Sequence, residues 1–424
     1  MTSAGVCKRS GTRTRESMVM RIAYVCADRG IAVDGNSGSS IHVREMVRAL
    51  AARGEEPTVF AASSGRIGGT EVPVVDIGGD PQLTELRART AKALRASGRE
   101  ATRAAEIYSL MLNQTLLVSL ASAARFDLVY ERQSLWSLAG LQYARRERIP
   151  FFLEVNAPLA DQQREYRELE LEEVAVAVEA LLFEQADRIF VTTGSLVEYV
   201  HARGGSRSKV RVLPCGAASH LFARRNAPRE PHGETFVVGF LGTLKPWHGT
   251  DVLLDAFALL RERRPGYRLL IVGDGPLRGE IEKACRERGF ADAVTMTGSV
   301  DHADVGRHLA AMDVGVASYP ELASFYFSPL KVWEYAAASV PIAASASGEL
   351  PALFPHKTAS LLHPPGNARK LARHIERLRD NPDLALRLAR NAHRVARAHT
   401  WDRLAARIVR AAESFARARP VTPQ

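Results

Sequence analysis

The segment from Ser328 to Glu334 has residue types and a spacing that could bind a phosphorylated ligand. Ser328 is suited to an N-cap and Pro329 to the first helical position, so we expect a helix to begin abruptly here. Its first N–H groups have no partner within the helix and carry the positive end of the helix dipole, which favours a phosphate. Glu334 follows about one and a half turns later, within reach of hydroxyl groups on the same ligand. This pattern indicates a nucleotide-sugar site; the alternative is an ordinary capped helix with an exposed glutamate.

A glycine- and serine-rich segment, Asp34 to Val43, follows the apolar run Met20 to Cys26, which we expect to be a buried parallel strand. Glycines let the backbone approach a ligand closely, and a helix N-terminus near Ser40 favours negative charge. We therefore predict that Gly38 and Ser39 contact the ligand; a plain flexible loop is the alternative. The segment lacks the GxGxxG pattern, which disfavours a dinucleotide site.

A second loop of this kind, Gly242 to Gly249, follows the apolar run Phe236 to Leu241. Lys245 could neutralise a diphosphate as a point charge. His248 could donate to the same group or lie at the surface. Gly273 begins a Gly-Asp-Gly-Pro turn after a later strand, where a structural role is at least as well supported as ligand contact.

Polar groups also follow two other expected strands. Glu131 and Arg132 come after one of them, and Glu154 and Asn156 end the next. They place ionisable and amide groups where an acceptor substrate would lie. The alternative is that they are loop residues that tie the fold together.

Strands alternate with helices twice along the chain, which predicts an α/β protein with two Rossmann-like, doubly wound parallel-sheet domains facing a central cleft. The expected parts are a disordered N-terminal extension (residues 1–18), an acceptor-binding domain (19–223), a linker (224–234), a nucleotide-sugar-binding domain (235–400) and a C-terminal helix (401–419) that packs back on the first domain.

The composition is that of a soluble globular enzyme, with 46% hydrophobic and 25% charged residues among 424. The four cysteines are scattered, and no long apolar run is present, so we expect a cytoplasmic protein. The net charge is +10, and much of the excess lies in an expected basic helix between Arg87 and Arg103. That helix is either a solvated face or a surface for anionic lipid, at the inner face of the membrane, or for an acidic acceptor. No nucleic-acid recognition motif accompanies the charge, so we expect no nucleic-acid partner.

From Met20 to Phe415, the chain resembles the retaining, nucleotide-sugar-dependent glycosyltransferases of family 4, which have the GT-B fold. The motifs that agree in order and spacing are Gly38 to Val43, Pro214-Cys215-Gly216, Gly239 to Thr243, Val272 to Pro276, Thr297-Gly298 and Ser328 to Pro341. Together they are specific for the family and not for a substrate.

The resemblance implies roles for individual residues. Glu334 would hold the nucleotide ribose, the backbone from Ser328 to Lys331 would contact the donor sugar and the distal phosphate, and Lys245 or His248 would take the place of the family's diphosphate-binding cations. The full set of expected donor-binding residues is Gly38, Ser39, Gly242, Thr243, His248, Gly273, Gly298, Ser328, Pro329, Leu330, Lys331 and Glu334. The expected acceptor residues are His42, Glu131, Glu154 and Asn156, and the expected catalytic residues are Lys245, Glu334, Arg132 and Asn156.

The chain also departs from the family pattern. Tyr326 stands where the family usually has the first of two glutamates, and Thr243 stands where an arginine is frequent. Glu131 and Arg132 occupy the place of a histidine, and Ser339 that of a glycine. These departures leave the class intact and the donor open.

The expected reaction is transfer of a sugar, with retention, from a UDP- or GDP-sugar to a small-molecule or lipid-linked acceptor, in antibiotic or cell-surface glycan biosynthesis. The chain contains no Asp-x-Asp pair for a divalent metal, so we expect no metal and no cofactor. A sugar-nucleotide 2-epimerase and a sugar-nucleotide-binding protein without turnover are the alternatives. Either a monomer or a homodimer is compatible with the sequence.

Overall fold

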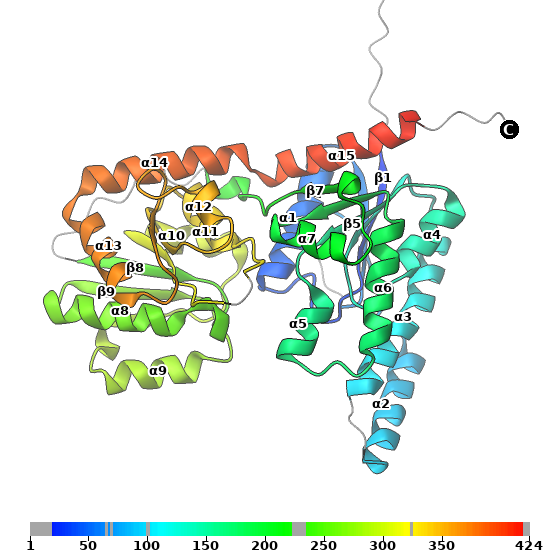
Figure 1. The fold of residues 1–424 in the computed structure, drawn as a ribbon, viewed down its shortest axis with the longest axis horizontal. Coiled ribbons are helices and arrows are strands. Elements are labelled where there is room, and N and C mark those ends of the chain that lie inside the picture. The colour runs from blue at the N-terminus through cyan, green and yellow to red at the C-terminus, as the bar shows by residue number, and fades with distance from the viewer. Residues whose placement is uncertain are drawn as a thin grey trace, which may run out of the picture.

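The computed structural model describes residues 19–63, 67, 71–98, 102–222, 235–322 and 325–418. The expected N-terminal extension (residues 1–18) and linker (224–234) lie outside the described residues. The described chain forms two lobes, each built around a parallel sheet with helices on both faces (Figure 1). The expectation of two doubly wound α/β units is therefore confirmed.

The N-terminal lobe contains a seven-stranded parallel sheet in the order β3-β2-β1-β4-β5-β6-β7. Its strands are β1 (Arg21–Cys26), β2 (Glu56–Ala61), β3 (Val74–Asp76), β4 (Leu128–Arg132), β5 (Phe151–Val155), β6 (Arg188–Val191) and β7 (Val210–Val212). Its helices are α1 (Gly38–Ala52), α2 (Pro81–Ala96), α3 (Thr102–Ser122), α4 (Ala139–Glu147), α5 (Leu159–Tyr166), α6 (Glu172–Gln185) and α7 (Ser195–Ala202). All five residues of β4 and of β5 are buried, as expected for parallel strands covered on both faces.

The C-terminal lobe contains a six-stranded parallel sheet in the order β10-β9-β8-β11-β12-β13. Its strands are β8 (Phe236–Leu241), β9 (Tyr267–Val272), β10 (Val294–Met296), β11 (Val314–Ala317), β12 (Ile342–Ser345) and β13 (Leu361–His363). Its helices are α8 (Thr250–Arg263), α9 (Arg278–Glu287), α10 (Val305–Ala310), α11 (Leu330–Ala337), α12 (Leu350–Leu353), α13 (Ala368–Asp380) and α14 (Pro382–Ala398), and α15 (Trp401–Ala418) follows.

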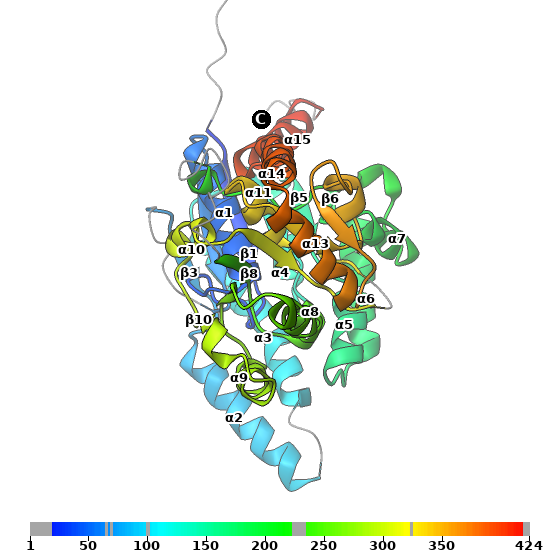
Figure 2. The ribbon, with the colours of Figure 1, turned by 90° about the vertical axis from the view of Figure 1, so that its left-hand side faces the viewer.

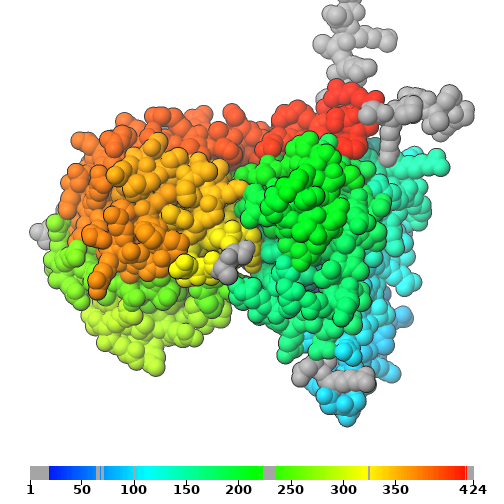
Figure 3. Space-filling view, in the orientation of Figure 1, coloured from blue at the N-terminus to red at the C-terminus, as the bar shows by residue number. Residues whose placement is uncertain are grey.

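The strand order places a topological switch point in each sheet, between β1 and β4 in one lobe and between β8 and β11 in the other. Neighbouring connections leave such a point in opposite directions, which opens a crevice outside the carboxyl ends of the strands. The loops after these four strands therefore face the space between the lobes, where the molecule is hollowed (Figure 3).

The expected basic helix between Arg87 and Arg103 is two helices in the structure. Arg87 lies on α2 and Arg103 on α3, and the pair projects beyond the N-terminal sheet (Figure 1 and Figure 2). No residue of α2 is buried, because this helix packs mainly on α3. None of the described helices is long and apolar enough to span a bilayer.

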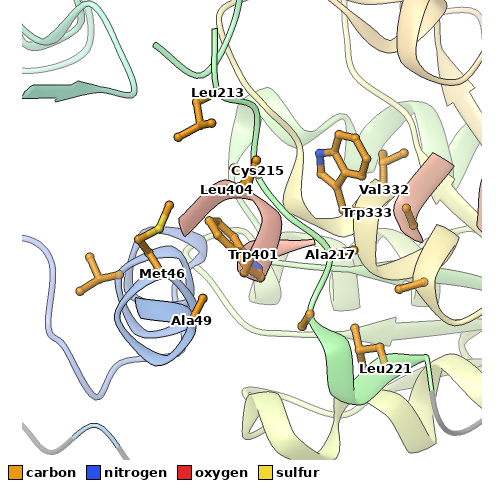
Figure 4. Close-up of a cluster of buried hydrophobic side chains, with 14 of the residues drawn as sticks. Met46, Ala49, Leu213, Cys215, Ala217, Leu221, Val332, Trp333, Trp401 and Leu404 are labelled. Carbon is orange, nitrogen blue, oxygen red and sulfur yellow. The ribbon is translucent and has the colours of Figure 1, made fainter. Parts of the chain in front are cut away.

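The two lobes share a hydrophobic core. Helices α14 and α15 run along one side of both lobes, with α14 packed on α11 and α15 on α1 (Figure 1). One cluster of buried side chains accordingly includes Met46 from α1, Trp333 from α11 and Trp401 from α15 (Figure 4). The cluster fixes α1 and α11, whose N-termini face the space between the lobes.

Candidate active site

A cavity of about 920 Å³ lies between the lobes. Its walls come from the loops after β1, β4, β8 and β9, and from the N-terminal parts of α1 and α11. Most of the expected site residues line it: Gly38, Ser39, His42, Arg132, Asn156, Gly242, Thr243, Lys245, His248, Gly273, Ser328, Pro329, Leu330, Lys331 and Glu334. Residues far apart in the sequence are thus brought to one place, although the role of each remains a prediction.

Helix α11 begins at Leu330, with Pro329 in the N-cap position and no side-chain cap. The expectation that Ser328 caps this helix is therefore wrong. The Ser328 hydroxyl instead accepts a hydrogen bond of 2.9 Å from the backbone N–H of Cys215, in the segment after β7. In the first turn of α11, the Val332 N–H donates to the Pro329 carbonyl, which leaves the N–H groups of Leu330 and Lys331 at the cavity wall. The serine ties this turn to the N-terminal lobe.

Gly273 explains how the backbone of two loops can meet at the cavity. Its φ is +136°, and a Cβ atom at this position would lie 2.2 Å from the carbonyl oxygen of Gly242. Because a side chain is excluded on both counts, the turn after β9 can pack directly on the loop after β8.

Glu334 is 4% exposed and already has a partner. The Nε2 atom of His302 lies 2.6 Å from its Oε1 atom, and the Nδ1 atom of the same ring lies 3.6 Å from Oε1 of Glu45 on α1. Burial alone would lower the pKa of His302, but the two carboxylates raise it to about 9, so the ring is charged at neutral pH. An imidazolium from the C-terminal lobe therefore joins Glu334 to the N-terminal lobe.

Three basic side chains, those of His248, Lys245 and Lys331, lie near the expected diphosphate site. Burial and the nearby Lys331 lower the pKa of His248 to about 3, so this ring is neutral and its Nδ1 can donate to the carbonyl of Thr243. Lys245 is half-buried, with Nζ 5.0 Å from the centroid of the Trp247 ring. Lys331, in the first turn of α11, is 7% exposed.

Glu154 is the centre of a buried polar cluster on the N-terminal side. Its Oε1 atom lies 2.8 Å from Nε2 of His42, 3.1 Å from Nη1 of Arg132 and 2.7 Å from Nδ2 of Asn156, while the Tyr130 hydroxyl donates to Oε2. Burial would raise the pKa of Glu154, but His42 and Arg132 lower it to about 2. Burial would likewise lower the pKa of His42, and Glu154 raises it to about 9.

This cluster presents His42, Arg132 and Asn156 to the cavity and keeps the carboxylate behind them. Because two cations share one carboxylate, the cluster carries a net positive charge at neutral pH. Glu154 is occupied by its donors, so we expect it to orient these three side chains rather than to touch the acceptor itself.

Two other expected site residues lie outside the cavity wall. Glu131 is fully buried on the opposite face of β4, where its carboxylate approaches Gly140 of α4. Burial raises its pKa to about 7. The alternation of side chains along a strand explains the error, because Arg132 points to the cleft and its neighbour must point away. Gly298 pairs with Gly273 through the backbone and supports the turn from behind.

Sequence reasoning missed several residues of the site. His302 and Glu45 escaped because they are single polar residues without a motif. The wall formed by α3 and the segment after β4 also escaped; it combines Leu112, Leu116 and Trp136 with Asn113. The helical spacing of the two leucines was the available signal, but it does not distinguish a cavity wall from an ordinary core. The wall of the cavity that the N-terminal lobe provides is thus partly apolar.

Comparison with known proteins identifies the family. A family model described as glycosyl transferase 4-like domain matches residues 37–216, and one described as glycosyl transferases group 1 matches residues 235–381. An alpha-D-kanosaminyltransferase of Streptomyces kanamyceticus is 29% identical over 174 residues, which are 40% of this chain and 44% of that protein. The match thus spans less than half the length of that relative.

Two further similarities extend over nearly the whole chain. A D-inositol 3-phosphate glycosyltransferase of Jonesia denitrificans is 25% identical over 91% of this chain and 94% of its own length. The structure of HepE from Anabaena in complex with UDP-glucose has a TM-score of 0.69 and 17% identity, and the match covers 93% of this chain and all of that one. With the two-lobed fold and the cavity between the switch points, these matches show that the chain belongs to the group 1, family 4-like glycosyltransferases with the GT-B fold.

Proposed function

We propose that this protein transfers a sugar, with retention of the anomeric configuration, from a UDP- or GDP-sugar to an acceptor in the cavity between the lobes. The observation that carries the proposal is the first turn of α11, where the N–H groups of Leu330 and Lys331 and the Lys331 side chain lie at the cavity wall. Glu334 follows one turn later. This arrangement suits a diphosphate at the helix N-terminus and a ribose behind it. The HepE structure, which contains UDP-glucose, supports a nucleotide sugar as the ligand.

In the proposed reaction, the bond between the anomeric carbon and the phosphate oxygen breaks, and its electron pair goes to the leaving diphosphate. The acceptor hydroxyl attacks from the same face, and its proton passes to the departing phosphate oxygen. Glu154 is held by four donor side chains, which argues against its acting as a covalent nucleophile. The protein then contributes positioning and stabilisation of the leaving group.

For the acceptor we favour a small amphipathic molecule or a lipid-linked one, because the acceptor side combines Trp136 and Leu112 with Arg132 and Asn156. The relatives named above, an alpha-D-kanosaminyltransferase and a D-inositol 3-phosphate glycosyltransferase, are compatible with a small polar acceptor. Biosynthesis of an antibiotic or of a cell-surface glycan remains the proposed context.

Thermal denaturation with UDP, GDP, ADP and dTDP tests the donor site. A nucleotide at 100 times its dissociation constant should add about 2.7 kcal/mol of stability. The matching nucleotide sugar should then be consumed only with an acceptor, and exhaustive chelation should leave turnover unchanged. Conversion of the donor without acceptor would indicate an epimerase, and binding without any turnover a binding protein.

A further inference from the structure

We propose that the ammonium of Lys331 is the cation that pairs with the diphosphate of the donor and with the leaving nucleoside diphosphate. This assignment rests on the proposed function and gives Lys331 the role that sequence reasoning gave to Lys245 or His248. Three features of the site support it: the position of the ammonium, the absence of an anionic neighbour at contact distance among the described residues, and the properties of the other basic side chains.

The first feature is the position of Lys331. It lies in the first turn of α11, lines the cavity and reaches towards the loop after β8, where a Cβ atom on Gly242 would lie 3.4 Å from Nζ. The free N–H groups of the helix start and the ammonium therefore face the same small region. A diphosphate in this region would receive backbone hydrogen bonds and a full positive charge together.

The second feature is that the ammonium is buried without an anionic neighbour at contact distance. Within the part of the chain that the structure describes, the Nζ atom has no hydrogen-bond partner. It lies 4.2 Å from the ring centroid of Phe240 and 5.5 Å from that of Tyr319. Cation–π contacts of this kind compensate little of the cost of burying a charge. A lysine retained at this cost is expected to meet an anion at some stage of the cycle.

The titration of Lys331 agrees with this picture. Burial lowers its pKa to about 7, and the more distant carboxylate of Glu334 opposes this shift only in part. The other titratable groups that face it are the neutral His248 and the Tyr319 hydroxyl, whose pKa is itself raised by burial. At pH values above 7, the free protein therefore holds Lys331 mainly as a neutral amine. A diphosphate would restore the charge by drawing one proton from solvent.

The third feature is that the other candidates for a phosphate-binding cation are neutral or remain partly exposed to solvent, which compensates their charge. Thr243 replaces the family's arginine, and His248 is neutral. Lys245 is only half-buried, with Nζ 5.0 Å from the centroid of the Trp247 ring, and its pKa is lowered by burial and then by the charge of Arg167. Lys331 keeps its proton during the reaction; it stabilises the negative charge that develops on the phosphate oxygen as the bond to the sugar breaks.

The test is calorimetric titration with UDP and GDP at about pH 8, in two buffers that differ in ionisation enthalpy. At this pH, roughly nine tenths of Lys331 is neutral in the free protein, so wild type should take up close to one proton on binding. Lys331→Met should bind about 10-fold more weakly or worse, with this proton uptake lost. Lys331→Arg should bind without the uptake, because its guanidinium is charged throughout. Lys245→Met is the matched control and should keep the uptake.

The possible outcomes distinguish the role proposed for Lys331 from the function proposed for the whole protein. Affinity of Lys331→Met within about twofold of wild type, or equal proton uptake in both proteins, would overturn the role of Lys331 while leaving the donor site intact. Failure of wild type to bind UDP, GDP, ADP or dTDP would overturn the proposed function and this assignment with it. Lys331→Met should also have a higher melting temperature than wild type, because it replaces a buried amine that has no hydrogen-bond partner among the described residues. Such an increase would exclude misfolding as the cause of weaker binding.

Discussion

At the scale of single residues, some side chains that we expect to bind the nucleotide sugar already make hydrogen bonds within the protein. Glu334 accepts from His302 in the structure, so one carboxylate oxygen is engaged and the other is available for a ribose hydroxyl. We therefore expect Glu334 to combine two tasks, which are to hold His302 in place and to bind the nucleotide. A variant of Glu334 should affect both.

We predict that Glu334→Gln weakens binding of UDP or GDP by about 10-fold, because charge-assisted hydrogen bonds are worth about 1.5–3 kcal/mol. Calorimetric titration measures the effect. The matched control is Glu45→Gln, which removes the other carboxylate that faces His302 but lies outside the cavity wall. Equal losses in the two variants would show that Glu334 acts through His302 alone.

The cluster around Glu154 gives a prediction about pH. Glu154 raises the pKa of His42 from 6.5 to about 9, so folding favours the protonated ring. The stabilisation is complete below about pH 6.5 and is lost as the pH rises through about 9. His42→Gln should therefore be less stable than wild type by about 1–3 kcal/mol at neutral pH, and the difference should shrink towards pH 10.

Denaturation of wild type and His42→Gln at several pH values gives this difference. Lys331 contributes to the pH dependence of the unfolding free energy with the opposite sign, because its pKa is lowered. This contribution is the same in both proteins and therefore cancels in the difference. A difference that stays constant with pH would mean that His42 is held by packing, for example by the Trp401 ring at 4.7 Å, rather than by charge.

At the scale of elements, the strands and helices that carry the site were largely readable from the sequence. Continuous apolar runs predicted β1 and β8, because strands covered on both faces leave no alternation. The start of α11 was predicted wrongly. Ser328 has the residue type of an N-cap, but its hydroxyl accepts a hydrogen bond from the backbone N–H of Cys215 in the other lobe. A bond between segments this distant has no local signature.

The loop after β8 illustrates a further limit of sequence reasoning. Gly242 in this loop was predicted to contact the donor, whereas Gly249 has a structural reason for its identity. Its φ is +64°, and a Cβ atom would lie 1.5 Å from the carbonyl oxygen of Ser318. Which glycine serves a ligand and which serves the fold is decided by neighbours from other strands.

This distinction can be tested. We predict that Gly249→Ala destabilises the protein by about 3 kcal/mol or more, because strain and overlap with backbone act together. Gly279→Ala is the matched control, since Gly279 lies in α9 with open space around it, and it should be neutral or stabilising by up to about 1 kcal/mol. Thermal denaturation compares the two. Similar stabilities of both variants would contradict the position assigned to Gly249.

At the scale of the whole molecule, the lobes are joined by more than the polypeptide connection. One hydrophobic cluster runs from α1 through α15 to α11 (Figure 4). The Ser328–Cys215 hydrogen bond and the His302–Glu45 ion pair also cross between the lobes. Trp401 is central to the cluster: the side chain is 3% exposed, and its backbone N–H would lie 2.7 Å from a Cβ atom on Gly216. The sequence predicted a C-terminal helix that packs back on the first domain, and α15 packs on α1. It did not predict that Trp401 lies in the core that the two lobes share.

We therefore predict that wild type unfolds in a single calorimetric transition, and that a bound nucleotide raises this transition as a whole. Trp401→Ala should cost about 3–5 kcal/mol and leave a cavity in the shared core, so that the lobes unfold separately. The nucleotide should then raise mainly the transition of the C-terminal lobe, which carries Lys331 and Glu334. Trp401→Phe, which keeps an aromatic ring in the cluster, should retain one transition. A single transition in Trp401→Ala that shifts as a whole with the nucleotide would show that the polar contacts alone couple the lobes.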